Sequence, residues 1–216
     1  MNWYRTIRAM PLAPVINEYP ERWNESLKDM KLNLSQETID KKMPGERAYL
    51  GHGYWGVAYD VPSGAVEKIS RSDDDWKNAQ EIMKRQEEEG KPLSFCVQVY
   101  DAEIIQENPI FYRFIIEKAD RMDPATAEKF DSYLLHMKAR YGRNIENSRM
   151  LSLEDMRFIQ NEYNIPDEDL PLMEQIRQFL LAIKSHNVSP WDVTSSNVGF
   201  RGNDIVILDI GSFDFR

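Results

Sequence analysis

The sequence has 216 residues, of which 42% are hydrophobic and 29% are charged, with 10 Gly and 11 Pro. This composition is typical of a globular protein and excludes a collagen-like, low-complexity or disulfide-scaffold chain. The formal net charge of -9 disfavours phosphate backbones and anionic membranes as partners. We therefore expect neither a nucleic acid nor a membrane to be the binding partner.

Cys96 is the only cysteine and lies in an apolar run at residues 93–97. No intrachain disulfide can form, and we expect a small buried thiol. No apolar run approaches the roughly 18 residues that a membrane helix needs. The apolar stretch near the N-terminus is broken by Pro11 and Pro14, which argues against a signal peptide. These features predict a cytoplasmic protein.

Residues 1–45 contain short helical patterns interrupted by four prolines. We interpret them as an N-terminal helical extension that packs onto a core supplied by the rest of the chain. Trp3 and Trp23 are expected to be largely buried there, because exposed apolar surface of that size would cause association.

Residues 46–119 have the pattern of a β-rich lobe. Short β-prone runs flank a Pro-Ser-Gly turn at 62–64, and a helix is predicted over 73–89. Two further strands are predicted at 95–105 and 110–117. The expected order is three strands, a helix and two strands.

Residues 120–216 are predicted to be mostly helical. Asp123 and Pro124 can begin one helix, and Ser152 with Asp155 forms a capping box for another. Residues 171–185 carry a broad apolar stripe that includes Phe179. Short strands are expected at 198–200 and 205–208. The predicted fold class is α+β, with a β-rich lobe followed by a helical lobe.

Gly51, Gly53 and Gly56 form a GxGxxG pattern, which dinucleotide-binding folds and kinase-type loops share. A dinucleotide-binding fold requires a helix that opens at the third glycine, whereas the residues after Gly56 are β-prone. Glycines in a loop between two strands let backbone N–H groups approach phosphate oxygens. The same glycines equally suit a plain hairpin, and the motif alone leaves both interpretations open.

Lys68 lies on the next predicted strand, where alternation places it on the same face as Val66. A lysine in this position can meet nucleotide phosphates if a carboxylate from the following helix holds it. A lone strand lysine is more often a solvated edge residue. Glu81 is the preferred partner for Lys68, and Glu87 is the alternative.

Two carboxylate motifs lie near the C-terminus. Asp192 and Asn197 are on a predicted loop, where an Asp and an Asn at this spacing can serve as proton acceptor and metal ligand. Asp209 ends an apolar strand beside Gly211, a position suited to holding Mg²⁺. Each motif is also a common turn former when it occurs singly.

These motifs follow the order of the protein-kinase signature set. The chain resembles the protein-kinase-like superfamily over about residues 48–211. Through residues 50–53, 58–59 and 191–192 it is similar to the small early serine/threonine kinases of lytic bacteriophages. The resemblance implies a bilobal kinase-like fold with a β-rich N-lobe at 46–119 and a truncated, mostly helical C-lobe at 120–216.

The resemblance also implies chemical roles. Lys68 would contact the α- and β-phosphates of ATP, with Glu81 as its partner. Asp192 would accept the proton of the substrate hydroxyl, while Asn197 and Asp209 would hold Mg²⁺.

The nucleotide would be contacted by further residues of the same resemblance. Its phosphates would lie under the glycine loop and its adenine against the backbone of the hinge. The residues implied are Gly51, Gly53, Gly56, Val66, Lys68, Glu117, Ala119 and Asp123. Asp123 falls where kinases often have a ribose-binding carboxylate, but we prefer its interpretation as a helix N-cap.

The sequence departs from the kinase pattern at several positions. Pro190 replaces the usual His, Thr194 replaces a Lys, and Ile210 replaces the Phe of Asp-Phe-Gly. Thr194 removes a positive charge near the transferred phosphoryl group. Only five residues follow Gly211, so no activation segment is expected.

The leading hypothesis is an ATP- and Mg²⁺-dependent kinase that phosphorylates Ser or Thr of proteins. Those proteins would be host proteins, in the host cytoplasm, if the chain is phage-encoded. One alternative is a small-molecule kinase of the aminoglycoside or choline type, which normally has a larger helical lobe. Another is a catalytically dead kinase-like protein that binds and inhibits a host target. The sequence leaves the oligomeric state open.

Overall fold

The computed structural model describes residues 41–43, 45–52, 55–141, 152–190 and 192–215. The predictions for the N-terminal extension, including Trp3 and Trp23, lie outside the described residues. The predictions for Gly53 and Trp191 also lie outside them.

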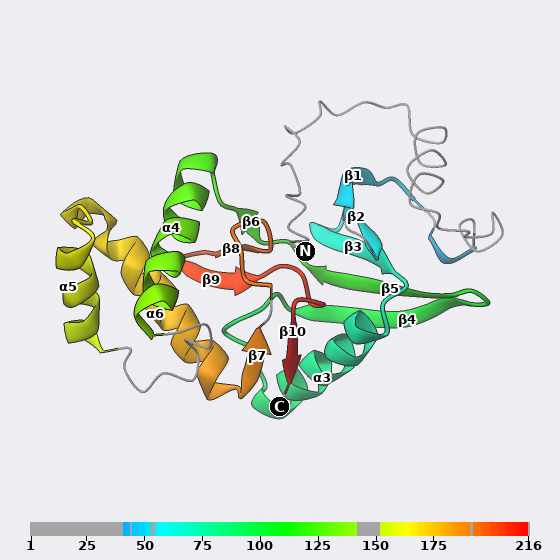
Figure 1. Ribbon diagram of the computed structural model, residues 1–216. Helices are drawn as coiled ribbons and strands as arrows, with labels where there is room; N and C mark the ends of the chain where they lie inside the picture. The colour runs from blue at the N-terminus through cyan, green and yellow to red at the C-terminus, as the bar shows by residue number, and fades with distance from the viewer. Residues whose placement is uncertain (1–40, 44, 53–54, 142–151, 191, 216) are drawn as a thin grey trace, which may run out of the picture. The chain divides into compact units, whose positions relative to one another are not determined.

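The chain divides into two compact units. Unit 1 comprises Met1–Glu89 and Gln98–Lys118, and unit 2 comprises Gly90–Val97 and Ala119–Arg216. Unit 1 is rich in β-sheet and unit 2 is mainly helical, so the fold class is α+β as predicted (Figure 1). Residues 90–97, which the sequence pattern placed in the first lobe, belong to unit 2.

Unit 1 contains a five-stranded antiparallel sheet in the order β1-β2-β3-β5-β4. Its strands are β1 (Ala48–His52), β2 (Gly56–Val61), β3 (Ala65–Ser70), β4 (Val99–Glu107) and β5 (Ile110–Glu117). Lys68 on β3 lies opposite Ala58 of β2 and Phe114 of β5. Strand alternation places Val66 on the same face as Lys68.

Helix α3 (Asp73–Glu89) has the bounds predicted from the sequence. Ser72 caps it, because its Oγ accepts the N–H of Asp75 at 3.3 Å. The side chain of Gln86 donates to the carbonyl of Val99 and accepts from its N–H, both at 3.0 Å. The helix is therefore fastened to the start of β4, along which it lies in Figure 1.

The sheet face opposite Lys68 carries an apolar cluster beside a buried ionic one. The apolar cluster is Met43, Val57, Tyr59, Ile69, Ile105 and Phe111. Glu67, which is 1% exposed, accepts hydrogen bonds from Arg47 and from Nε of Arg113. Arg113 also donates to Glu103 at 2.7 Å. A buried carboxylate is tolerated here because two guanidinium groups neutralise it.

The described residues of unit 2 form the helices α4 (Pro124–Tyr141), α5 (Leu153–Glu162) and α6 (Leu170–Ser185), with a short 3-10 turn η2 (Asp167–Asp169) before α6. The predicted capping box of Ser152 and Asp155 is confirmed. Each helix contributes its apolar face to a core that contains Phe130, Leu134, Met137, Met156, Ile159, Met173, Ile176, Phe179, Leu180 and Ile183.

Two small sheets complete unit 2. The first joins β6 (Asp120–Arg121), β8 (Val198–Arg201) and β9 (Asp204–Ile207), and the second joins β7 (Val188–Pro190) to β10 (Phe213–Phe215).

The segment Gly90–Val97 lies alongside β9. Val97 donates its N–H to the carbonyl of Ile207 at 3.0 Å, and Ile207 donates to the carbonyl of Phe95 at 2.8 Å. The guanidinium of Arg201 donates to the carbonyls of Leu93 and Cys96, at 2.9 and 2.7 Å. Cys96 is buried, as predicted. The strand predicted at 95–105 therefore begins only at 99, because residues 95–97 pair with β9.

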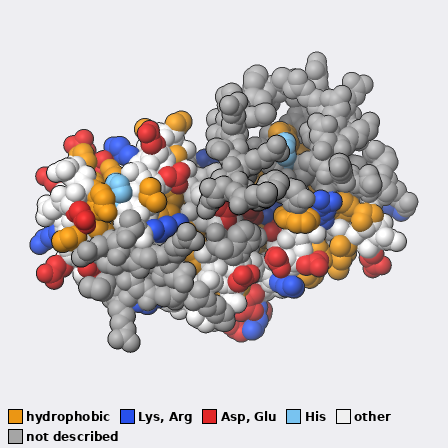
Figure 2. Space-filling view, viewed as in Figure 1, with side chains coloured by type: hydrophobic (Ala, Val, Ile, Leu, Met, Phe, Trp, Pro, Cys, Tyr) orange, Lys and Arg blue, Asp and Glu red, His pale blue; other side chains and the backbone are white. Residues whose placement is uncertain are grey.

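The described surface mixes charges of both signs. Figure 2 shows acidic and basic side chains interspersed with hydrophobic ones on the visible face. Among the helices that the structure describes, none is long and apolar enough to cross a bilayer.

Candidate functional site

The loop between β7 and β8 carries Asp192 and Asn197. The amide Nδ2 of Asn197 donates to Oδ2 of Asp192 at 2.7 Å and to its backbone carbonyl at 3.2 Å. The N–H of Asn197 donates to the carbonyl of Thr194 at 2.9 Å. Asn197 is buried, whereas the carboxylate of Asp192 is exposed to solvent. The loop therefore closes on Asn197 and presents an acidic group outward.

Asp209 reaches the same place from the end of β9. Leu208 donates its N–H to the carbonyl of Asn197 at 2.8 Å, which sets Asp209 next to the loop. The N–H of Asp192 donates to the carbonyl of Ser212 at 3.3 Å, and Ser212 donates to the carbonyl of Asp209 at 2.9 Å. Asp192, Asn197 and Asp209, which are predicted to act together, are thus connected by hydrogen bonds within unit 2.

The oxygen atoms in this group suit a hard cation such as Mg²⁺, which prefers carboxylate and amide oxygens. Because Nδ2 of Asn197 faces Asp192, its Oδ1 points away from that carboxylate. The N–H of Gly211 donates to Oδ1 of Asp209 at 3.2 Å and orients the carboxylate. The hydroxyl of Ser212 beside them is buried, with no hydrogen-bond partner among the described residues. The residues therefore fit a magnesium ion held by Asn197 and Asp209.

Lys68 in unit 1 pairs with Asp75 and not with Glu81, contrary to the prediction. Its Nζ lies 2.9 Å from Oδ2 of Asp75, and the two side chains are 15% and 5% exposed. Glu81 instead pairs with Arg85 at 2.6 Å and with Lys84 at 3.8 Å on the outer surface of α3.

The rotation of α3 about its axis explains why Lys68 pairs with Asp75 and not with Glu81. Asp75 lies in the first turn of the helix, close to the end of β3, and begins a buried stripe that continues through Asn78, Ala79 and Ile82. Glu81 is about 9 Å further along the axis and about 120° around it. Sequence reasoning overlooked Asp75 as a partner, although its place on the apolar stripe of α3 was a usable signal.

The glycine motif occupies a strand-loop-strand segment. Gly51 is on β1, and Gly56 begins β2, so no helix opens at the third glycine. This arrangement excludes a dinucleotide-binding turn. A Cβ on Gly56 would lie 2.4 Å from the carbonyl oxygen of Ile69. The close approach of β2 to β3 is therefore by itself a sufficient reason for glycine at this position.

The predicted hinge follows β5. Glu117 donates its N–H to the carbonyl of Gln98 at 2.8 Å, and its carboxylate accepts the N–H of Gln98 at 3.0 Å. The backbone N–H of Glu117 is already bonded to Gln98, so an adenine contact at Glu117 would use its backbone carbonyl. Ala119 lies in the short connection between β5 and β6.

Asp123 caps α4. Its Oδ1 accepts the N–H groups of Ala125 and Thr126 at 3.0 and 3.1 Å, and its Oδ2 accepts the Thr126 hydroxyl at 2.6 Å. The hydrogen bond from that hydroxyl holds the pKa of Asp123 below its usual value. The N-cap interpretation is therefore confirmed.

No model of a protein family matches the chain, and no curated protein sequence matches it. Among solved structures, it is similar to the aminoglycoside phosphotransferase APH(2'')-Ib with ADP bound, at 18% identity and a TM-score of 0.37. It is also similar to APH(2'')-IIa in a ternary complex with streptomycin and ATP, at 17% identity and a TM-score of 0.37. Each match covers 84% of this chain and 72% of the other. A TM-score this low does not establish a common fold, so the proposals below depend on the residues of this chain.

Proposed function

We propose that this chain is an ATP- and Mg²⁺-dependent phosphotransferase of the protein-kinase-like superfamily. The observation that carries the proposal is the hydrogen-bonded group of Asp192, Asn197 and Asp209 in unit 2. Each of these residue types matches the part it plays in phosphoryl transfer, and they come from two separate sequence motifs.

Asp192 is suited to act on the acceptor. Its exposed carboxylate orients the acceptor hydroxyl and takes up its proton as the oxygen attacks the γ-phosphorus of ATP. A new bond forms between that oxygen and the γ-phosphorus, while the bond to the bridging oxygen breaks and ADP leaves with its electron pair. The donation from Asn197 to Oδ2 fixes the direction of the carboxylate.

Magnesium and the phosphates are assigned to other residues. Asn197 and Asp209 would hold the ion, which neutralises charge on the phosphate oxygens when bound. Lys68 binds the α- and β-phosphates, and Asp75 holds its ammonium in place. The glycine loop at Gly51 and Gly56 supplies backbone N–H groups.

The remaining contacts are with adenine and the acceptor. The carbonyl of Glu117 and the backbone of Ala119 would meet adenine. We propose Ser or Thr hydroxyls of proteins as acceptors, supported by the likeness of the glycine loop and catalytic loop to phage kinases. We propose a reducing, cytoplasmic setting, because the single cysteine of the sequence, Cys96, is buried and can form no intrachain disulfide.

The test is phosphoryl transfer by the full chain. The protein is incubated with radiolabelled ATP and MgCl₂, in one series with a bacterial lysate and in another with streptomycin, and ADP release is followed in parallel. Wild type is compared with Asp192→Asn, which should lose about 100-fold or more of the transfer rate. ATP affinity, measured by calorimetry, should change by no more than about threefold, because Asp192 acts on the acceptor.

Asp204→Asn is the matched control, since Asp204 is an exposed acidic residue at the start of β9. Equal transfer by wild type and Asp192→Asn would refute the assignment of Asp192. Label on streptomycin alone would replace the protein acceptor by a small molecule. ATP binding without any ADP release would favour the inactive binding protein.

A further inference from the structure

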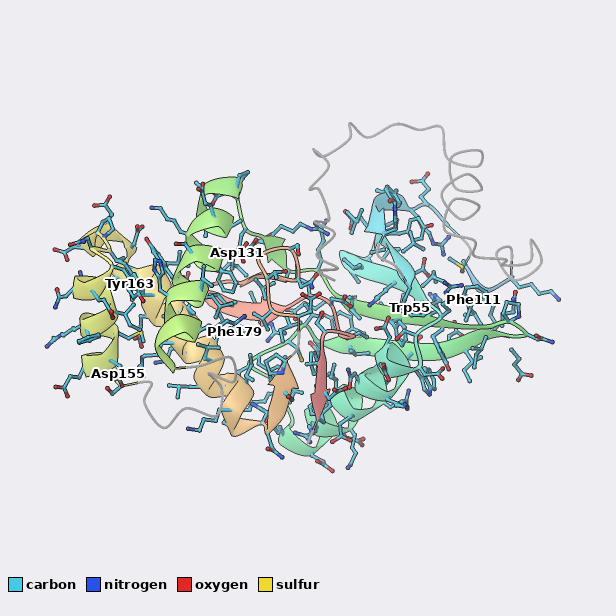
Figure 3. All side chains as sticks on the ribbon, in the orientation of Figure 1. Trp55, Phe111, Asp131, Asp155, Tyr163 and Phe179 are labelled. Atoms are coloured by element: carbon cyan, nitrogen blue, oxygen red, sulfur yellow. The ribbon has the colours of Figure 1, made fainter. Side chains whose placement is uncertain are left out.

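The catalytic loop is attached to helix α4 through a pair of hydrogen bonds. Asp131 on α4 accepts the backbone N–H of Ser195 through Oδ1 at 2.8 Å and the Ser195 hydroxyl through Oδ2 at 2.6 Å. Figure 3 labels Asp131 on this helix. Ser195 lies between Asp192 and Asn197 in the loop. A carboxylate that takes both donors of one residue fixes its backbone and its side-chain rotamer together.

Asp131 sits on a firmly held part of α4. The neighbouring side chains of Phe130 and Leu134 are buried in the core of unit 2. On the next residues around the helix, Lys129 and Tyr133 both donate to Asp169 before α6, at 2.6 and 2.5 Å. Because these contacts fix the helix, the position of Asp131 is fixed by packing and not by the loop itself.

A second set of hydrogen bonds joins residues of the loop to one another. Asn197 closes the loop onto Thr194 and Asp192, and the hydroxyls of Thr194 and Ser196 share a hydrogen bond of 2.8 Å. These bonds set the shape of the loop, whereas the bonds to Asp131 attach that shape to α4.

We propose that Asp131 is a positioning residue for phosphoryl transfer, which acts through Ser195 to hold Asp192 and Asn197 in their working orientation. The inference rests on the proposed function. Asp131 itself touches neither the phosphates nor the acceptor in this mechanism. Small displacements of reacting groups slow an enzymatic step far more than they change the free energy of unfolding. Removal of the Asp131 carboxylate should therefore lower turnover far more than stability.

The experiment compares four variants with wild type: Asp131→Ala, Asp131→Asn, Ser195→Ala and the control Glu128→Ala. Glu128 is an exposed carboxylate on the same helix, so its removal changes the charge by the same amount. Asp131→Ala should lower kcat about 10- to 100-fold while KM for ATP stays within about twofold. Ser195→Ala keeps the hydrogen bond from the backbone N–H of residue 195 to Asp131, so its kcat should fall less than that of Asp131→Ala.

Two readouts separate positioning from stability alone. Asp131→Asn can still accept the Ser195 N–H and donate to its hydroxyl, so it should recover much of the lost turnover. Amide hydrogen exchange at Ser195, followed by NMR, should accelerate in Asp131→Ala and stay unchanged in Glu128→Ala. The thermal midpoints of Asp131→Ala and Glu128→Ala should lie close together.

Wild type and Asp192→Asn provide the baseline. If they differ but Asp131→Ala turns over like Glu128→Ala, the positioning role is overturned while the proposed function stands. Faster exchange at Ser195 with unchanged turnover overturns it as well. If wild type and Asp192→Asn show the same turnover, the proposed function fails, and the inference fails with it.

Discussion

Asp75→Asn tests the pairing of Lys68 most directly. The substitution keeps the size of the side chain and leaves the backbone N–H bond to Ser72 intact. It removes the negative charge 2.9 Å from the Lys68 ammonium, at a place where the two side chains are only 15% and 5% exposed. Breaking a fully buried ion pair costs about 3–5 kcal/mol, and breaking an exposed one costs at most about 1 kcal/mol.

Lys68 keeps some contact with water, and the amide oxygen of the new side chain can still accept a hydrogen bond from it. We therefore expect Asp75→Asn to lower the free energy of unfolding by about 1–3 kcal/mol. The matched control Glu81→Gln breaks only ion pairs on the surface of α3, with Arg85 and Lys84, and should change it by no more than about 0.5 kcal/mol.

Urea unfolding of the full chain gives the stability difference, and ADP release gives the functional one. If Lys68 binds the phosphates as proposed, phosphoryl transfer should fall at least about tenfold in Asp75→Asn, because the substitution displaces Lys68 from its proposed position. In Glu81→Gln it should remain near the wild-type value. The assignment of Asp75 as the partner of Lys68 would be refuted if Glu81→Gln lost more stability, or more phosphoryl transfer, than Asp75→Asn.

Three further outcomes are expected. Glu67→Gln leaves two guanidinium groups without their buried carboxylate and should destabilise the chain by about 3 kcal/mol in urea; a loss below about 1 kcal/mol would contradict this. Phe179→Ala opens a cavity in the helical core and should cost about 3–5 kcal/mol in the same assay, unlike an exposed Phe158→Ala. The hydrogen bond from Lys129, followed by that from a tyrosine hydroxyl, lowers the pKa of Asp169. The ionised Asp169 carboxylate stabilises the folded state fully above about pH 4, and this stabilisation disappears as the pH falls through the lowered pKa. The stability advantage of wild type over Asp169→Asn should therefore shrink in acid. An advantage that stays constant with pH would exclude the ionised carboxylate as its cause.

The elements of unit 1 were largely predictable. The bounds of α3 follow from acidic residues at its start and apolar spacing along it, and the shared face of Val66 and Lys68 follows from strand alternation. Both signals are local in sequence and therefore survive without knowledge of the fold. The ionic partner of Lys68 depends on how α3 is rotated against the sheet, which the sequence does not give, so the prediction chose Glu81, with Glu87 as the alternative.

Contacts between distant segments were not predictable. Residues 95–97 are β-prone, but their sequence does not reveal that they pair with Ile207. The bond between Asp131 and Ser195 joins residues 64 positions apart, and both are polar residues that the pattern would leave in solvent. Asp192, Asn197 and Asp209 were predicted to act together because their motifs are short and their spacing is characteristic, and hydrogen bonds connect them in the structure.

The path of the chain between the two units limits how the protein can be cut into fragments. Leu93, Phe95, Cys96 and Val97 are each 0% exposed, and they complete unit 2 although they precede the last strands of unit 1 in sequence. A fragment that begins at 119 would lack all four side chains and the hydrogen bonds that residues 95 and 97 make to Ile207 of β9. A fragment that ends at 118 would carry the same four without the groups that cover them. Expression of the helical half therefore requires the 90–97 segment, for instance fused ahead of residue 119 through a flexible linker. Expression of the β-rich half requires that the same segment be replaced.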